Sequence, residues 1–247
     1  NACRLINAEG DGIPGLVVDR YGDCLVMVVG TAGVERRREE IVAALAAAAN
    51  PRGILERSEG PARRLEGLED RRETVWGEEP PSAIAIRENG LVFEVDVRGG
   101  QKTGFFLDQR DNRRQIEDLV RGRSVLNCFS YTGAFSVYAA RGGAARVVSV
   151  DSSEAANEAA RRHLLANGFS PAAHPVIRED VFRYLRNTDE DFDFIILDPP
   201  AFAKNRREAP RAARGYKDIN LQALKRLGPG GLLATFSCSQ AFQGLEI

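Results

Sequence analysis

The stretch Ser124-Val-Leu-Asn-Cys-Phe-Ser-Tyr-Thr-Gly-Ala-Phe135 decides the fold. Its apolar run predicts a buried strand over residues 124–129, and Tyr131-Thr132-Gly133 forms a turn before a helix over residues 134–141. A turn with a glycine lets the backbone approach a nucleoside cofactor, and the N-terminus of the following helix favours the polar end of that cofactor. The stretch therefore indicates the first strand, turn and helix of a cofactor-binding α/β domain.

The same alternation continues on both sides of this stretch. Helices are predicted at residues 108–120, 153–166 and 219–227, and strands at residues 146–150, 174–178, 192–197 and 231–236. Strands that alternate with helices pair in parallel and form a doubly wound sheet. Such sheets bind ligands at the carboxyl ends of their strands, so the residues that follow each strand are the candidate site.

The first part of the chain has a different rhythm. Short apolar runs split by glycines predict strands, residues 35–48 predict one helix, and residues 58–81 are charged and are expected to form a loop. Asn89-Gly90 separates two further strands and predicts a two-residue hairpin turn. We therefore expect two domains, a small β-rich α+β domain at residues 1–98 and a Rossmann-type domain at residues 99–247.

Composition excludes several classes of protein. No stretch of the 247 residues approaches the roughly 20 apolar residues of a membrane span, and the N-terminus lacks the features of a signal peptide. The four cysteines include no C-x-x-C pair and there are only two histidines, so no metal site or disulfide framework is expected and the cytoplasm is the natural compartment. Because residue 1 is Asn and the one methionine is Met27, we expect a processed chain or a piece of a longer one.

Acidic residues follow two of the predicted strands. Asp151 comes eighteen residues after Gly133, where a carboxylate can accept both ribose hydroxyls, although Asp151-Ser-Ser-Glu154 also fits a helix-capping box. Asp180 and Val181 follow the next strand, where such residues read an adenine edge or simply belong to a loop. The turn lacks G-x-G-x-x-G and so has little room for a pyrophosphate, which favours S-adenosylmethionine over a nicotinamide cofactor.

The fourth strand ends in Asp198-Pro-Pro-Ala-Phe202. Two prolines stop the strand and present Asp198 at the mouth of the site, although a plain Pro-Pro loop is an alternative interpretation. Amino-group methyltransferases often place an aromatic residue directly after the two prolines. Here that position is Ala201, with Phe202 one residue later, which argues mildly against methylation of an exocyclic amine.

One cysteine follows the fifth strand, in Thr235-Phe-Ser-Cys-Ser239. An isolated cysteine is usually a small buried apolar residue. At a methyl-donor site, however, a thiolate that adds to carbon-6 of a pyrimidine makes carbon-5 nucleophilic enough to attack the methyl group. Cys238 is therefore the candidate nucleophile. Cys128 is the competing thiol, but it lies within the first strand and is expected in the core.

The four motifs together resemble one family. Gln101-Lys-Thr-Gly-Phe-Phe-Leu-Asp-Gln-Arg110, the turn at residues 127–135, the Asp198 motif and Ser237-Cys-Ser239 are similar to bacterial and archaeal 23S rRNA 5-methylcytosine methyltransferases. In that family a PUA domain precedes a small central domain and a Rossmann-type methyltransferase domain. The Gln101 motif also occurs in a related guanine-7 methyltransferase that lacks the cysteine, so Cys238 favours the pyrimidine enzyme.

The resemblance implies a cofactor, a substrate and roles for particular residues. The cofactor is S-adenosylmethionine, the substrate is large-subunit ribosomal RNA, Cys238 is the nucleophile and Asp198 orients the base and contacts the cofactor. The implied cofactor-binding residues are Phe129, Ser130, Tyr131, Thr132, Gly133, Asp151, Ser152, Asp180, Val181 and Asp198, with Thr103, Phe105 and Arg110 closing over them. Two departures from the family pattern are expected. The sequence contains no segment that we interpret as a PUA domain, and it stops at Ile247, where the family fold continues with a helix and further strands.

Basic charge is concentrated where RNA would be held. Residues 201–226 contain eight basic and two acidic side chains, a net charge of +6 in a chain of net charge −1. A solvated face is the plain interpretation, and a groove that follows phosphates is the functional one. The expected RNA-binding residues are Lys204, Arg206, Arg207, Arg211 and Arg214. The alternatives are a methyltransferase for guanine N7 or an exocyclic amine, and a noncatalytic RNA-binding module or fragment; a homodimer is left open.

Overall fold

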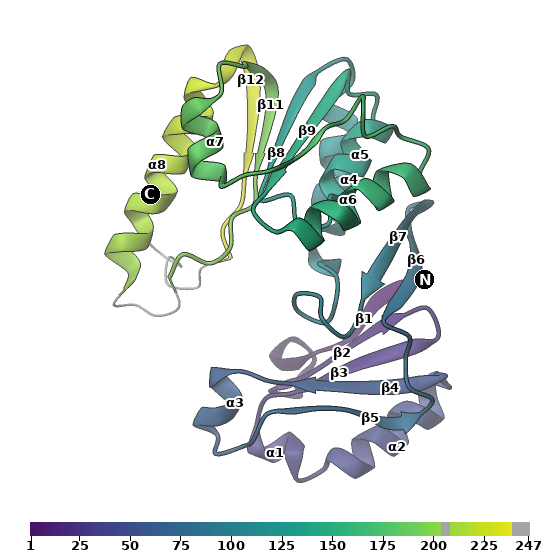
Figure 1. Ribbon diagram of the computed structural model, residues 1–247. Coiled ribbons are helices and arrows are strands. Elements are labelled where there is room, and N and C mark those ends of the chain that lie inside the picture. Colours follow the sequence, from purple (N-terminus) through teal and green to yellow (C-terminus); the bar gives the residue numbers. More distant parts are fainter. Residues whose placement is uncertain (204–207, 239–247) are drawn as a thin grey trace. The chain divides into compact units, whose positions relative to one another are not determined.

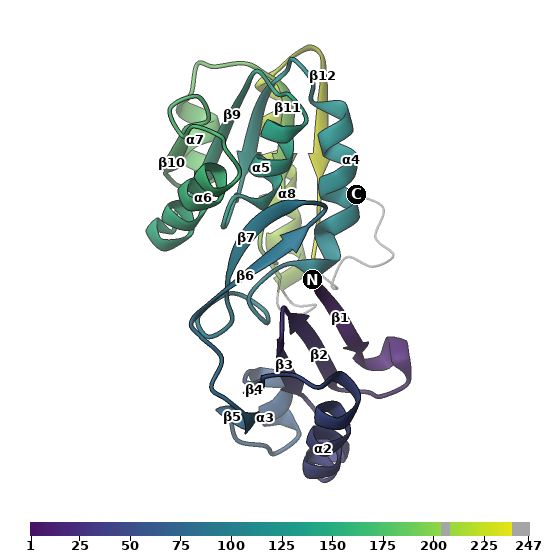
Figure 2. The same ribbon diagram turned by 90° about the vertical axis from the view of Figure 1, so that its right-hand side faces the viewer.

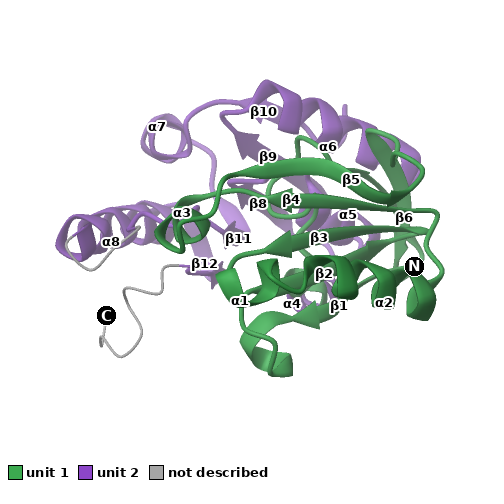
Figure 3. Cartoon of the chain, turned by 90° about the horizontal axis from the view of Figure 1, so that it is seen from below, with its two compact units in different colours: residues 1–110 green, residues 111–247 purple. Residues whose placement is uncertain are grey.

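The computed structural model describes residues 1–203 and 208–238, and its chain divides into two compact units (Figure 3). The units are residues 1–110 and 111–247, whereas the sequence analysis placed the domain boundary after Arg98. Residues 99–110 belong with the N-terminal unit because they bond to its strands. Arg57, for example, donates hydrogen bonds to the carbonyl oxygens of Val97 and Gly100 at 3.1 and 2.9 Å.

The N-terminal unit is built on a mixed five-stranded sheet (Figure 1). The strands follow the chain in the order β1 (Ala2–Asn7), β2 (Leu16–Tyr21), β3 (Cys24–Val29), β4 (Gly53–Ser58) and β5 (Arg71–Gly77). Only β3 and β4 pair in parallel, and α2 (Arg38–Ala49) connects them, after the short helix α1 (Ala32–Glu35). Val42 and Leu45 of α2 pack on Leu25 and Met27, which makes the apolar core on that face of the sheet.

A hairpin of β6 (Ala83–Glu88) and β7 (Leu91–Asp96) completes this unit. Its turn residues Asn89 and Gly90 have φ angles of 48° and 85°, so both adopt the left-handed conformation that a two-residue hairpin turn requires. The predicted hairpin turn is confirmed.

The predicted loop over residues 58–81 is wrong. The segment contains α3 (Pro61–Leu65) and the edge strand β5, whose only large apolar side chains are Val75 and Trp76. Charge on an edge strand discourages pairing with other chains, and it also hides the strand from an apolar pattern. Here the strand forms because β4 supplies its hydrogen-bonding partners, with Glu56 opposite Glu73.

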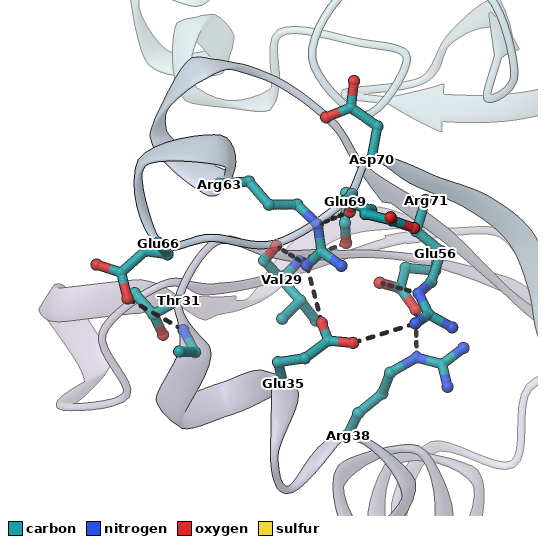
Figure 4. A network of polar contacts seen from close by, with 12 residues as sticks. Val29, Thr31, Glu35, Arg38, Glu56, Arg63, Glu66, Glu69, Asp70 and Arg71 are labelled. Carbon is teal, nitrogen blue, oxygen red and sulfur yellow. Dashed lines mark hydrogen bonds and ion pairs between the residues drawn. The ribbon is translucent and has the colours of Figure 1, made fainter.

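The charges of β4 and β5 are balanced by arginines from neighbouring elements (Figure 4). Arg38 of α2 donates to both Glu56 and Glu73, which relieves the repulsion between those two facing carboxylates. Arg63 of α3 is 3% exposed and donates to the Val29 carbonyl oxygen at 2.8 Å and to Glu35 at 2.9 Å. Arg71 of β5 pairs with both Glu35 and Glu73, so these ion pairs join three helices and two strands into one network.

The C-terminal unit is a doubly wound sheet of five parallel strands, as predicted (Figures 1 and 2). Its spatial order is β10 (Val176–Arg178), β9 (Arg146–Asp151), β8 (Ser124–Cys128), β11 (Phe192–Leu197) and β12 (Leu227–Thr235). Helices α4 (Arg110–Leu119), α5 (Ala134–Arg141) and α6 (Glu154–Ala166) lie on one side, with α7 (Val181–Asn187) and α8 (Ala209–Lys225) on the other. The order reverses beside β8, where such folds bind ligands.

Helices on both faces bury most of the residues of the central strands. Leu126 of β8, Val148 of β9 and Ile195 of β11 are fully buried, as expected for strands covered on both sides. Each such side chain contributes roughly 1.5–3 kcal/mol relative to an exposed position. Among the helices of the described ranges, none has the combination of length and apolar composition that a bilayer span needs.

The last helix and strand begin earlier than predicted. Helix α8 begins at Ala209 rather than near residue 219, and β12 begins at Leu227 rather than at residue 231. The first half of α8 buries Ala212 and Tyr216, and the small size of Ala212 makes the apolar period weak in the sequence. Pro210 fits the first turn, where its missing N–H costs nothing.

Candidate functional site

The turn after β8 is tightly wound. Phe129, Tyr131 and Gly133 have φ angles of 57°, 46° and 75°, an uncommon conformation for the two residues that are not glycine. The Ser130 N–H donates to the Val150 carbonyl oxygen at 3.1 Å and the Gly133 N–H to the Ser130 carbonyl oxygen at 2.8 Å. Backbone strain of this kind persists where surrounding bonds hold it, and it is typical of ligand-binding turns.

Gly133 permits a close approach between this turn and α6. A Cβ atom at Gly133 would lie 2.7 Å from the Cβ of Ala160, so a larger residue there would push the helix away. One glycine thus serves helix packing. The turn has no second glycine that would make room for a pyrophosphate.

Asp151 ends β9 and ties the turn to the start of α6. One carboxylate oxygen accepts the Tyr131 N–H at 2.9 Å, and the other accepts the Ser153 N–H at 2.9 Å. The helix cap is Ser153, whose hydroxyl accepts the Ala156 N–H at 3.3 Å, so Asp151 is not the cap that the capping-box alternative described. Because a carboxylate oxygen has two acceptor sites, both oxygens can still accept ribose hydroxyls.

The next strand end carries Asp180 and Val181. Asp180 is the N-cap of α7, and its carboxylate accepts the Arg183 N–H at 2.9 Å, so it is more than a loop residue. Val181 is buried, whereas Ser152, at the neighbouring strand end, is exposed.

The turn offers a polar atom that fits a cofactor. Ser130 is buried, and within the described residues its hydroxyl has no hydrogen-bond partner. A buried hydroxyl without a partner costs free energy that a bound polar group would recover. Together with the Asp151 carboxylate and the single-glycine turn, this hydroxyl fits a nucleoside cofactor without a pyrophosphate.

The Asp198 motif lies at the same edge of the sheet. Leu197 is in register with Cys128 of β8 and with Thr235 of β12, so the exits of the three strands are neighbours. The Phe236 N–H donates to the Leu197 carbonyl oxygen at 2.8 Å, so the segment after β12 stays beside the segment after β11. The Cys238 Sγ then lies 3.7 Å from the Pro199 carbonyl oxygen.

The two cysteines of this unit differ in exposure. Cys238 is exposed, whereas Cys128 is fully buried. Burial raises the pKa of the Cys128 thiol far above its ordinary value, because a thiolate there would have no solvent or counter-charge. Only the thiolate is a nucleophile, so Cys128 is suited to the core and Cys238 to chemistry.

Phe202, after the two prolines, packs inward. Its ring centre lies 4.6 Å from that of Tyr216 on α8, 5.8 Å from that of Phe182 and 6.4 Å from that of Phe129. Gly215 lets α8 approach this ring, since a Cβ there would be 3.3 Å from a Phe202 ring carbon. Phe202 therefore links α8 to the turn after β8 instead of presenting a face for base stacking.

The basic residues of α8 form an exposed face. Its buried side consists of Ala212, Tyr216, Ile219 and Ala223, and the opposite side carries Arg211 and Arg214. Lys204, Arg206 and Arg207 lie outside the described residues. Lys217 and Lys225, which belong to the basic stretch at residues 201–226, share the exposed side. Within the described part of the chain, no ion-pair partner is found for Arg211, Arg214, Lys217 or Lys225.

The structure places the residues of the Gln101 motif inside the N-terminal unit. Thr103 is buried and donates its hydroxyl to the Asp19 carboxylate at 2.5 Å, and the Tyr21 hydroxyl lies 2.8 Å from it. Phe105 packs on Phe93 with ring centres 5.3 Å apart. Arg110 pairs with Glu88 at 3.3 Å and donates to the Ala2 carbonyl oxygen. A role for Thr103, Phe105 and Arg110 in cofactor binding stays a prediction.

A cavity of about 310 Å³ lies in the N-terminal unit. It is lined by Glu35, Arg63, Asp70, Arg71 and Glu73, among others. Its charged groups are already paired, because Glu35 binds both arginines, Arg71 also binds Glu73, and Asp70 binds Arg64. We interpret this cavity as part of the framework in Figure 4.

Known proteins similar to this chain are RNA methyltransferases and other methyltransferases. The ribosomal RNA large subunit methyltransferase I of Aeromonas salmonicida is 47% identical over 239 residues, and that of Aeromonas hydrophila is 48% identical over 240. Each alignment covers 96% of this chain and 60% of the relative, so the chain spans about 60% of the length of these curated relatives.

Solved structures agree with this. A methyltransferase solved in complex with SAH (S-adenosylhomocysteine) superimposes with a TM-score of 0.80 at 34% identity, over 94% of this chain and 60% of that chain. A SAM-dependent methyltransferase from Streptococcus mutans gives 0.79 at 33%, over 94% and 59%. Residues 42–242 match the family of S-adenosylmethionine-dependent methyltransferases, which is most of the chain. The family match agrees with the nucleoside-binding features at the ends of β8 and β9, and this chain belongs to the S-adenosylmethionine-dependent methyltransferase family.

Proposed function

We propose that this chain is the catalytic part of an enzyme that methylates carbon-5 of a cytosine in large-subunit ribosomal RNA. The similarity to ribosomal RNA large subunit methyltransferases supports the RNA substrate. The observation that carries the choice of atom is the exposed Cys238 thiol beside the Pro199 carbonyl oxygen. Ribosomal RNA as substrate also makes the cytoplasm the expected compartment.

The chemistry assigns a step to the thiol. The Cys238 thiolate adds to carbon-6 of the cytosine, which forms an S–C bond and moves the carbon-5–carbon-6 π electrons onto carbon-5. When bound, S-adenosylmethionine supplies the methyl group that carbon-5 takes up. A base then removes the carbon-5 proton, the double bond re-forms and the S–C bond breaks, which returns the thiolate. Asp198 orients the cytosine at the exit of β11.

Residues of the described site have separate duties in this proposal. The Asp151 carboxylate holds the ribose, and the Ser130 hydroxyl gains a partner when the cofactor is bound. Asp180 and Val181 lie at the neighbouring strand end for the adenine. Because Phe202 is engaged by Phe182 and Tyr216, it does not stack on a target base, which disfavours methylation of an exocyclic amine.

The two cysteines provide the test. In Cys238→Ala, methyl transfer to ribosomal RNA should be lost while SAH still binds in a calorimetric titration. Cys128→Ala is the control, and its transfer rate per folded molecule should stay near that of the unchanged protein. Retained transfer in Cys238→Ala would refute the covalent mechanism and favour guanine N7 or an amine. Failure of the unchanged protein to bind SAH would instead indicate a noncatalytic RNA-binding module.

A trapping experiment asks the same question directly. RNA that carries 5-fluorocytosine cannot lose a proton from carbon-5, so the adduct with Cys238 should persist through denaturing electrophoresis. The Cys128→Ala protein should form the adduct, and the Cys238→Ala protein should not. Mass spectrometry of the digested adduct would identify the cysteine.

A further inference from the structure

One buried histidine contacts the cofactor turn. His163 lies on α6 with 1% of its surface exposed, and its Nδ1 is 2.7 Å from the Thr132 carbonyl oxygen. A carbonyl oxygen can only accept, so Nδ1 carries the hydrogen and donates it. Ala160, one helical turn earlier, is the residue against which Gly133 packs. The same face of α6 therefore contacts two successive residues of the turn.

The turn needs such a contact at this place. Thr132 lies between Tyr131 and Gly133, which both have a left-handed backbone, so its peptide groups are held in an uncommon orientation. The Tyr131 N–H is fixed by Asp151 and the Gly133 N–H by the Ser130 carbonyl oxygen. The His163 imidazole fixes the Thr132 carbonyl group. Without this donor, the carbonyl group would be free to rotate or would remain buried without a partner.

We propose that His163 is a positioning residue for S-adenosylmethionine, because it holds the turn in the conformation that the cofactor binds. The inference deepens the proposed function only in its cofactor step, and it does not depend on which RNA atom is methylated. If the turn loses this bond, cofactor binding must restore the conformation, and the cost appears as lower affinity. The methyl-transfer step itself should change little once the cofactor is bound.

The chain contains a matched control. Its second histidine, His174, lies before β10 in the same unit and is 8% exposed, and burial lowers the pKa of its imidazole. Its ring packs edge-on against Phe169 at 6.0 Å, and within the described residues its Nδ1 has no hydrogen-bond partner. His174 thus resembles His163 in burial but has no bond to the turn.

Calorimetric titration with SAH and thermal unfolding separate the two roles. His163→Phe should raise the dissociation constant of SAH about tenfold, as expected for one buried carbonyl left without its donor. In RNA methylation it should raise the KM for S-adenosylmethionine and leave kcat nearly unchanged. His174→Phe should keep the affinity for SAH, and the melting temperature of each variant shows whether it is folded. His163→Gln, which retains a donor, should recover part of the affinity. Unchanged SAH affinity in His163→Phe would overturn the proposal.

A second measurement needs no variant that could fail to fold. With two histidines in the chain, the imidazole nitrogen resonances of a ¹⁵N-labelled sample are readily assigned. His163 should show the tautomer with hydrogen on Nδ1, and its resonances should move on addition of SAH while those of His174 stay. Equal insensitivity of both rings to SAH would contradict the inference. Cofactor binding is measured without RNA, so this result is independent of the Cys238 tests.

Discussion

The Arg–Glu network of the N-terminal unit and the exposed face of α8 use the same residue type in opposite ways. In the network, Arg38, Arg63 and Arg71 are paired with carboxylates, and Arg63 is almost fully buried (Figure 4). On α8, Arg211 and Arg214 are exposed and have no ion-pair partner among the described residues. Arginine is abundant throughout the chain, so composition does not distinguish the two groups. Their partners do.

This difference separates stability from binding. A buried charge must be compensated, and removing its partner is costly, so the network reports on folding. Exposed cations that repel one another along a helix contribute little to folding. They attract a polyanion, whose binding releases counterions and depends steeply on salt. We therefore interpret the network as part of the framework, whereas the α8 face stays the predicted RNA contact.

The largest expected effect is on the network. Arg63→Ala should lower the free energy of unfolding by about 3–5 kcal/mol, because Glu35 loses one of its two arginine partners and the carbonyl oxygens of Val29 and Glu69 lose their donor. Arg64→Ala is the matched control. Arg64 is the next residue of α3, and it pairs with Asp70 at the surface, so its loss should lower the free energy of unfolding far less than the loss of Arg63. Denaturant titration measures both, and equal costs would contradict the distinction.

A smaller effect is expected on α8. Arg214→Ala should leave the free energy of unfolding within about 0.5 kcal/mol of the original. The slope of log affinity for RNA against log salt should fall by about 0.7–0.9, the value for one lost phosphate contact. Arg121→Ala is the control, because Arg121 is also exposed and has no ion-pair partner in the described chain but precedes β8 at the opposite edge of the sheet. Equal changes in the two slopes would show that only net charge matters.

The smallest effect is expected when a carboxylate is introduced beside the lysines of α8, so that they are paired as the arginines of the network are. Leu221 is 46% exposed and lies four residues from both Lys217 and Lys225. Leu221→Glu should stabilise the helix by about 0.2–0.5 kcal/mol per new pair and weaken RNA binding. Leu221→Gln separates the charge from the change of side chain. If the charged variant bound RNA as tightly as the glutamine variant, the α8 face would not be the RNA contact.

Much of the C-terminal unit could be predicted from the sequence, because its signals are local. The predicted strand at residues 192–197 and helix at residues 134–141 are confirmed with the same bounds. Long apolar runs covered on both faces and a single-glycine turn favour these elements without help from distant residues. The turn that lacks a second glycine predicted S-adenosylmethionine as the cofactor, and the family match confirms it.

Other features were decided by tertiary structure. Strand β5 forms because β4 offers an edge and Arg38 neutralises Glu56 and Glu73, and neither partner is close to it in sequence. Ser153 caps α6 in place of Asp151, and the Asp151 carboxylate accepts the N–H of Tyr131, which is distant in sequence.

The sequence by itself determined the order of most strands and helices of the C-terminal unit, the strand-end acids and the two candidate thiols. Only the folded chain decided that Cys128 is buried and Cys238 exposed, that Phe202 packs on Tyr216, and that His163 donates to Thr132. The physical reason is the range of the interactions. Backbone preference and periodic burial act between near neighbours, whereas solvent exposure and hydrogen-bond partners depend on which distant segments meet.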